Sequence, residues 1–280
     1  MNINRVIKTK NRNFFLLIFF VLLSIFSIFR LIDNAMQLDS WQYGEWLINY
    51  QSGFVRRGLI GEFLYLLSKI FNSNLQVTFI LFLSAIVFFY YYLNYQFIKN
   101  IKLNFINLLI IFSPIFYFFL VIISKVGIKK EIILYIFYLL FLYQLKSDNF
   151  NIKKNWIFVF IFPFLLLNHE GQFFFLPYLV LPLLFVVKKH EIKEFKIQSL
   201  SLFFISILTT LLLYNFRGTV DHTLNICESL NIYAPAKCDW WGPISALKHE
   251  LLRDIENKPL SLFYMFADFK TWMGFLFYIF

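Results

Sequence analysis

Two adjacent arginines, Arg56 and Arg57, stand in a glycine-rich segment at residues 53–61. The pattern over residues 58–71 has helical spacing, which predicts an amphipathic helix that begins directly after the arginines. Guanidinium groups bind phosphate through two parallel hydrogen bonds, and the N-terminus of a helix attracts anions. The pair therefore predicts a phosphate or diphosphate clamp, supported by Glu62 on the polar face of the helix. The alternative interpretation is that the arginines anchor the chain to lipid headgroups.

A second group of cations, Lys129 and Lys130, lies between two apolar runs and is followed by Glu131. The topology derived below places this short segment on the outer face, where membrane proteins carry few lysines. An anionic ligand would explain them, so we expect Lys129 and Lys130 to join the arginines at one phosphate site. The alternative is that the assigned topology is wrong at this loop.

His169 and Glu170 interrupt a long row of Phe and Leu residues. Ionisable groups are costly at membrane depth and usually mark a function there. A histidine beside a carboxylate can transfer protons near neutral pH. The pair is therefore a candidate acid–base group, although a capped and mutually hydrogen-bonded turn would also account for it.

Two further acids, Asp39 and Glu45, follow the first apolar run and lie among tryptophans. Aromatic faces stack on sugar rings, and a carboxylate can accept the proton of a sugar hydroxyl. These acids are therefore candidate bases at a sugar site. An aromatic belt with ordinary loop charges is the alternative.

The composition places these groups in a membrane protein. Of the 280 residues, 60% are hydrophobic and only 15% are charged, and the mean hydropathy is +0.67. These values exclude a soluble globular enzyme, a disordered chain and a disulfide-stapled miniprotein. Runs of about 20 apolar residues predict a polytopic, all-α transmembrane helical bundle.

About eight spans are expected, and the stretch between the lysine pairs at 153–154 and 188–189 decides the count. It is too long for one crossing, so we divide it into a hairpin of two short spans with its tip at residues 168–171. The expected segments are 14–32, 76–98, 103–124, 132–145, the hairpin 155–187, 197–216 and 260–280. The last run reaches Phe280 without a closing Lys or Arg, which indicates an unusual C-terminus or a piece of a longer protein.

The net charge of +10 then becomes a signal of orientation. With the N-terminus inside, the cytoplasmic segments hold 13 Lys and Arg residues against three acids, which equals the whole excess. The outer half is balanced, so the charge predicts no nucleic-acid partner. All candidate reactive groups fall on the outer half.

We expect one integral membrane domain over 1–280, with outer loops at 33–74, containing the interfacial helix, and at 217–259. Arg217, at the start of the second loop, is a supporting cation for the anion site. Cys227 and Cys238 both lie in that loop and would form a disulfide in an oxidising compartment, the alternative being two free thiols. The cysteines and histidines do not match a structural zinc site, and no cofactor is expected.

Three segments carry a resemblance to a known family: Asn49 to Glu62, which contains the arginine pair, Gly127 to Glu131, and Asn168 to Gly171. Together they resemble bacterial O-antigen and capsular polysaccharide repeat-unit polymerases, integral membrane glycosyltransferases of the GT-C type. The resemblance spans roughly residues 30–190 and implies a GT-C-like fold in the inner membrane. Such proteins are commonly longer than this chain.

The resemblance implies that one undecaprenyl-diphosphate-linked glycan is transferred to the sugar end of another on the periplasmic face. Arg56, Arg57, Lys129 and Lys130 would bind the donor diphosphate, and one of Asp39, Glu45, His169 and Glu170 would deprotonate the acceptor. Membrane lipids, a chain-length regulator and a flippase of the same pathway are the further partners that it implies.

Three alternatives remain open. Another GT-C transferase would use a polyprenyl-monophosphate sugar, with Asp33 or Asp39 as base and a requirement for a divalent metal. A transporter or flippase for lipid-linked glycans would carry charges through the membrane centre, where these runs have few. A non-enzymatic scaffold gives no reason for the outward lysines.

Overall fold

The computed structural model describes residues 3–36, 40–99, 101, 128–147, 150–216, 218–231, 243, 244 and 247, and the regular structure of this part of the chain is helical. The α-helices are α1 (Ile3–Met36), α2 (Ser40–Leu47), α3 (Leu59–Ile70), α4 (Leu75–Ile98), α7 (Glu131–Leu145), α8 (Trp156–Asn168), α9 (Leu176–Val186), α10 (Ile192–Asn215) and α11 (Val220–Asn231). Short 3-10 helices occupy Ile152–Asn155, Glu170–Phe175 and Lys189–Glu191.

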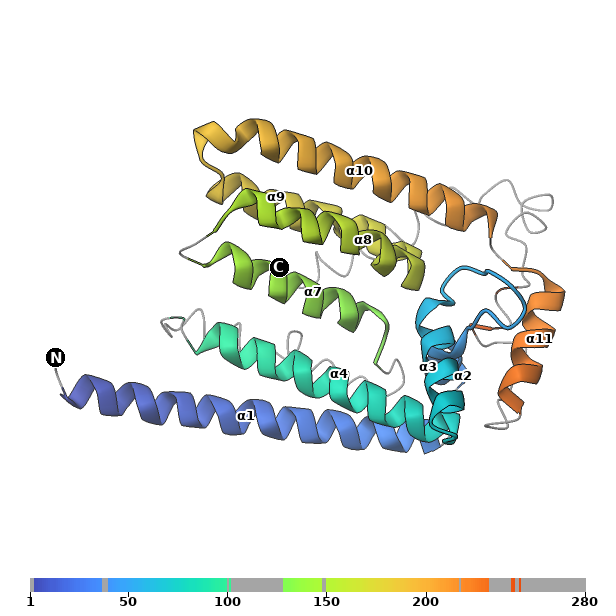
Figure 1. Cartoon of the computed structure of the whole chain (residues 1–280). Helices are drawn as coiled ribbons and strands as arrows, with labels where there is room; N and C mark the ends of the chain where they lie inside the picture. Colours follow the sequence, from blue (N-terminus) through green and yellow to red (C-terminus); the bar gives the residue numbers. More distant parts are fainter. Residues whose placement is uncertain are drawn as a thin grey trace, which may run out of the picture.

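The long helices lie side by side along one direction, while α2, α3 and α11 gather at one end of the row and run across it (Figure 1). In the row, α1 packs on α4, α4 on α7, α7 on α9 and α8 on α10. The loop between α2 and α3, residues 128–130 directly before α7, and the turn between α8 and α9 all lie at the end where the cross-running helices are. We call this the crossed end; the candidate charged residues that the structure describes lie there.

Three helices are long and apolar enough to cross a membrane: Asn11–Met36, Leu75–Ile98 and Lys189–Asn215. They confirm the helices predicted over 14–32, 76–98 and 197–216. The segment predicted at 132–145 is the 15-residue helix α7. The stretch 155–187 is broken at His169 into α8 and a second helical segment, Glu170–Val186, as the hairpin predicts. The runs predicted at 103–124 and 260–280 lie outside the described residues.

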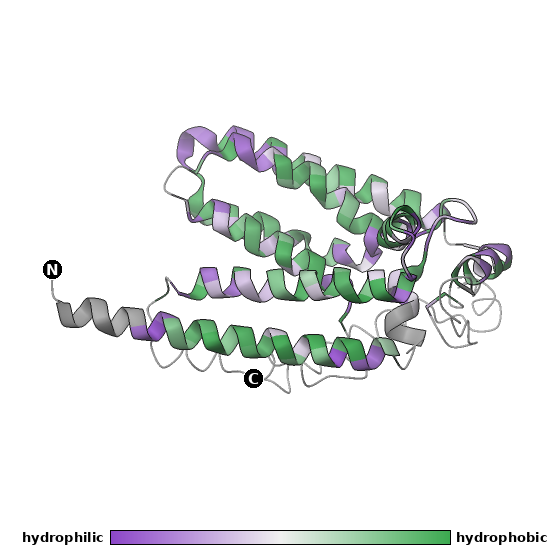
Figure 2. Cartoon of the chain, turned by 60° about the horizontal axis from the view of Figure 1, so that its bottom comes forward, coloured by the Kyte–Doolittle hydropathy of each residue, from purple (hydrophilic) through white to green (hydrophobic). Residues whose placement is uncertain are grey.

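Hydrophobic residues occupy the middle of the long helices, and hydrophilic residues are more frequent toward their ends (Figure 2). At the end opposite α3, an Arg12 Nη2 donates a hydrogen bond to the carbonyl of Lys99 at 2.6 Å. Lys146 lies over the Phe97 ring in the same region, with Nζ 5.5 Å from its centroid. The lysine-rich helix ends that the sequence assigns to one side of the membrane therefore lie together in space.

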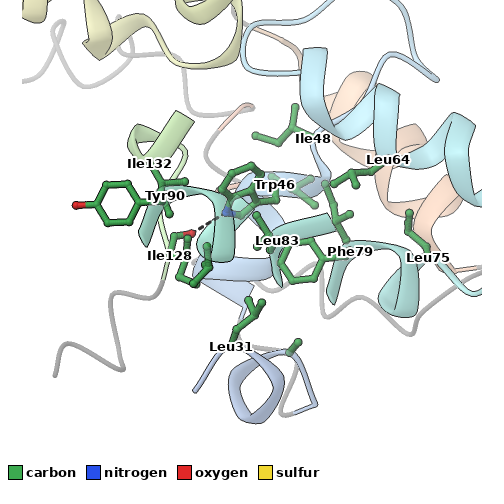
Figure 3. Packing of buried hydrophobic residues seen from close by; sticks show 14 of the residues in the cluster. Leu31, Trp46, Ile48, Leu64, Leu75, Phe79, Leu83, Tyr90, Ile128 and Ile132 are labelled. Carbon is green, nitrogen blue, oxygen red and sulfur yellow. Dashed lines mark hydrogen bonds between the residues drawn. The ribbon is translucent and has the colours of Figure 1, made fainter. Parts of the chain in front are cut away.

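The core of the crossed end lies where α2, α3 and α4 meet (Figure 3). Trp46, Leu64, Phe79 and Leu83 are all almost completely buried there. The tryptophan ring provides the largest of these apolar surfaces, and its ring nitrogen donates to the carbonyl of Ile128 at 2.7 Å. A buried indole N–H requires a partner, so this bond fixes the start of the α7 segment against α2.

Candidate functional site

The loop between α2 and α3 carries the two arginines, and two glycines close it. An ideal Cβ on Gly58 would lie 2.2 Å from Cε1 of Tyr50, and one on Gly61 would lie 1.9 Å from the carbonyl oxygen of Ile48. Both distances are too short for a Cβ atom, so each glycine allows the start of α3 to pack directly on the segment that follows α2. The two glycines therefore have a packing role in this loop.

Glu62 completes the closure of this loop. Its Oε2 accepts a hydrogen bond from the backbone N–H of Tyr50 at 2.8 Å, and both carboxylate oxygens accept from the side chain of Gln51. Because Glu62 lies in the first turn of α3, its charge also suits the positive end of the helix dipole. Glu62 therefore supports the arginine loop from the helix behind it.

Arg57 has a backbone φ of +65°, in the left-handed region that non-glycine residues rarely adopt. Lys130 stabilises this conformation, because its Nζ donates a hydrogen bond to the Arg57 carbonyl at 2.6 Å. The Lys130 side chain is fully buried. The structure therefore places Lys130 beneath the loop as a support, whereas the sequence predicted that it would contact the ligand.

Glu170 binds both arginines across the site. Its Oε2 accepts from Nε of Arg57 at 2.8 Å, and its Oε1 accepts from Nη2 of Arg57 at 2.5 Å and from Nη1 of Arg56 at 3.2 Å. The three side chains are about one-fifth to one-quarter exposed, so solvent reaches them from outside. The backbone N–H of Arg56 donates to the carbonyl of Phe216 at 2.8 Å, which ties the loop to the end of α10.

A second set of charges adjoins this one. Oε2 of Glu45 lies 3.6 Å from Nζ of Lys129, and Oε1 of the same carboxylate lies 3.6 Å from Nε2 of His169. Glu131 approaches the same ring nitrogen at 4.0 Å. Glu45 is buried, while Lys129 and Glu131 are about one-third exposed. The sequence did not single out Glu131, although its place directly after the lysine pair was a usable signal.

The hydrogen bonding of His169 fixes its tautomer. Nδ1 accepts a hydrogen bond from the backbone N–H of Gly171 at 3.1 Å and so caps the 3-10 helix that follows. In the neutral ring the proton must then be on Nε2, the atom that faces Glu45 and Glu131. The neutral histidine is therefore a donor toward these two carboxylates.

The environment shifts the ionisation of the site strongly. Burial alone would raise the pKa of Glu170, but the hydrogen bonds and charge of Arg57 outweigh it and lower the pKa to about 2. Burial lowers the pKa of Lys130 to about 7, against the attraction of Glu45. Burial, helped by the charge of Arg57, also lowers the pKa of His169. At neutral pH the site therefore holds an ionised Glu170 and a neutral His169.

Two amides beside the charged groups were missed by the sequence reasoning. Asn168 and Gln172 are both buried, and neither side-chain amide has a hydrogen-bond partner among the described residues. They lie on either side of His169 and Glu170 in the chain, so this turn carries polar side chains beyond the charged pair that the sequence singled out.

The structure thus brings Glu45, Arg56, Arg57, Lys129, Lys130, His169 and Glu170 together at the crossed end. Asp39, Arg217 and Cys238 lie outside the described residues. Cys227 is disulfide-bonded, as the disulfide prediction requires. In the part of the chain that the structure describes, no group of three or more His, Cys, Asp or Glu side chains could hold a metal ion.

The arrangement can therefore bind an anion next to groups that exchange protons. Two guanidinium groups and one ammonium group provide positive charge at the surface, and two carboxylates flank a neutral imidazole beside them. No protein-family model, no curated protein sequence and no solved structure matches the chain.

Proposed function

We propose that the chain is a GT-C-type membrane glycosyltransferase that polymerises undecaprenyl-diphosphate-linked repeat units for O-antigen or capsule. One observation carries the proposal: Arg56, Arg57 and Lys129 gather beside His169 and its carboxylates at one end of a helical bundle. A lipid-linked diphosphate needs positive charge to bind its headgroup and a bilayer to hold its tail. The crossed end provides the positive charge, and it adjoins apolar helices long enough to lie in a bilayer.

The proposed orientation follows from the separation of charge. Positive residues favour the cytoplasmic side, so the end with Arg12, Lys99 and Lys146 would face the cytoplasm of a bacterial inner membrane. The crossed end would then face the periplasm, and α3 would lie in the outer interface with Phe63, Leu66 and Ile70 exposed to lipid. The expected eight spans belong to this proposal.

In the proposed reaction, Arg56, Arg57 and Lys129 bind the donor diphosphate and stabilise its charge as it leaves. The bond between the donor's anomeric carbon and the diphosphate oxygen breaks, and the acceptor hydroxyl oxygen forms the new glycosidic bond. Lys130 contributes by holding the carbonyl of Arg57 rather than by touching the ligand.

The proton of the acceptor hydroxyl must go to a base. With a pKa of about 2, Glu170 in its ion pair is a weak base. Neutral His169 carries its proton on Nε2, so it serves as a donor and not as the base. We therefore assign the base to the carboxylates on either side of Nε2, with Glu131 reachable from the surface and Glu45 buried behind it.

The decisive experiment deletes the gene and complements it with the wild type or with Arg56→Ala/Arg57→Ala. Surface polysaccharide is then separated by length. The proposal expects a ladder of repeat lengths with the wild type and only the single-repeat product with the double variant. A normal ladder in a well-expressed double variant would rule out the clamp.

The same gel separates the rival functions. If the protein is a side-branch transferase that uses a polyprenyl-monophosphate sugar, its deletion leaves the ladder intact but changes the mass of each repeat. If it is a flippase, its deletion removes all surface repeats, including the single one, because the lipid-linked unit stays inside. Either result would overturn the polymerase proposal.

A further inference from the structure

The arginine pair is occupied by a carboxylate that takes the place of a phosphate. Glu170 offers its two oxygens to Nε and Nη2 of Arg57, which is the fork geometry by which an arginine holds a phosphate. One of these oxygens also accepts from Nη1 of Arg56. A diphosphate that enters this site meets two arginines whose best donors already bind an anion.

The arginines are held in place independently of Glu170. The carbonyl of Arg57 accepts from Lys130 beneath it, and the backbone N–H of Arg56 donates to Phe216. Glu62 and Gly61 fix the helix that follows. We therefore expect the backbone of the arginine loop to keep its shape when the carboxylate of Glu170 moves away. The free energy lost in that movement is then mainly that of the ion pair with Arg56 and Arg57.

Glu170 stands where it can leave. It is the first residue of a 3-10 helix, follows an extended residue, His169, and precedes Gly171. Its side chain is about one-quarter exposed. Rotation about its side-chain bonds would break its contacts with Arg56 and Arg57.

We propose that Glu170 is a built-in competitor of the anionic ligand, which neutralises Arg56 and Arg57 in the empty site and is displaced when the diphosphate of a lipid-linked donor binds. This rests on the proposed function. The surrounding bilayer supplies phosphodiester headgroups in large excess, each with a single negative charge. Without Glu170, an arginine pair at the interface would bind these headgroups. A headgroup must compete with the Glu170 carboxylate, and a diphosphate, which has more negative charge and two phosphates, competes better than a single phosphodiester.

The test measures binding of farnesyl diphosphate to the full chain in dodecyl maltoside, a detergent without phosphate or charge. Glu170→Gln removes the competing charge and keeps the size of the side chain. We expect it to bind the probe about tenfold more tightly than the wild type, since a charge-assisted contact of this kind is worth a factor of that order. Affinity that is unchanged or weaker in Glu170→Gln overturns the proposal.

The matched control is Glu131→Gln, which removes the same charge from the same cluster, at a carboxylate that lies 4.0 Å from Nε2 of neutral His169. We expect a gain of less than about threefold from it, since distant charges act weakly through solvent. An equal gain in both variants would mean that net charge acts, and not displacement. Should Glu170→Gln not fold, Glu170→Asp retains the charge on a shorter side chain and is expected to give a smaller gain.

An arginine background separates this inference from the proposed function. In Arg57→Gln, the change Glu170→Gln should no longer tighten binding, because the main partner of the carboxylate is absent. If Arg57→Gln weakens binding but Glu170→Gln does not tighten it, the diphosphate site stands and the competitor role is wrong. If neither the wild type nor Glu170→Gln binds the probe, the proposed function fails with it.

Discussion

Arg57 and Glu170 lie 113 positions apart in the chain and form a two-point ion pair, with Nε 2.8 Å from Oε2 and Nη2 2.5 Å from Oε1. The pair joins the loop before α3 to the tip of the α8–α9 hairpin. It makes the crossed end one charged unit rather than a set of neighbouring loops.

The fork geometry of Arg57 should be essential. Arg57→Lys keeps the charge but loses the two parallel donors, so a complemented deletion strain should lose most long-chain polysaccharide. The measurement is the length distribution on a gel. Arg12→Lys is the control, since Arg12 lies at the opposite end and a lysine can still donate to the carbonyl of Lys99. Equal ladders in both variants would contradict the assignment.

The indole of Trp46 should hold the lysine segment in place. Trp46→Phe leaves the buried carbonyl of Ile128 without its donor, at a cost of about 1–3 kcal/mol in the free energy of unfolding. Because that carbonyl directly precedes Lys129, binding of farnesyl diphosphate should weaken as well. Trp156→Phe removes a similar bond, to Glu194 at the opposite end, and should lower the melting temperature without changing affinity. Weaker binding in both variants would count against a local effect.

Gly61 should tolerate no side chain. Gly61→Ala puts a Cβ 1.9 Å from a backbone oxygen, so α3 must move, with an expected loss of about 1–3 kcal/mol of stability. At Gly44 an added Cβ would make only ordinary contacts, the nearest 3.6 Å from Cδ of Pro243. Thermal unfolding in detergent should therefore separate the two alanine variants clearly. A Gly61→Ala protein as stable as Gly44→Ala would refute the close packing of α3.

Lys130 should make stability depend on pH. Its pKa is about 7 in the folded chain and is ordinary, near 10.5, in the unfolded chain, so between these values the unfolded state binds more protons. The free energy of unfolding should therefore rise as the pH is raised from about 7 toward 10. Lys130→Met should reduce that slope, which thermal unfolding at a series of pH values would reveal. A slope that is the same in both proteins would contradict the burial of a titrating lysine.

The disulfide of Cys227 should stabilise the segment that contains α11. A reducing agent should lower the melting temperature of the wild type, since such a bond is worth about 2–4 kcal/mol. Cys227→Ser should melt at the lower temperature with or without the reductant. A reductant effect that persists in Cys227→Ser would show that the bond is not its target.

The sequence by itself determined the class of the protein and the places of its long helices. Apolar runs and helical spacing describe neighbours within one element, so they located the long apolar helices at 14–32, 76–98 and 197–216 and the helix after Arg57. The lysine pattern also predicted which helix ends lie together, because the preference of Lys and Arg for the cytoplasmic side of a membrane does not depend on how the helices pack. The candidate residues were found for the same reason: a charge in an apolar run is visible without a fold.

Only the tertiary structure decided what these residues contact. The sequence made Glu170 a candidate base, whereas the structure pairs it with Arg57, which lowers its pKa. The sequence made Lys130 a candidate phosphate-binding residue, whereas the structure buries it under the arginine loop. Gly61 faces the backbone oxygen of Ile48, the residue that follows α2, a contact that no spacing within α3 encodes. These relations join residues that are distant in the chain, and a periodic pattern carries no information on which helix end meets another. The pairing of the cluster is therefore a property of the packed bundle.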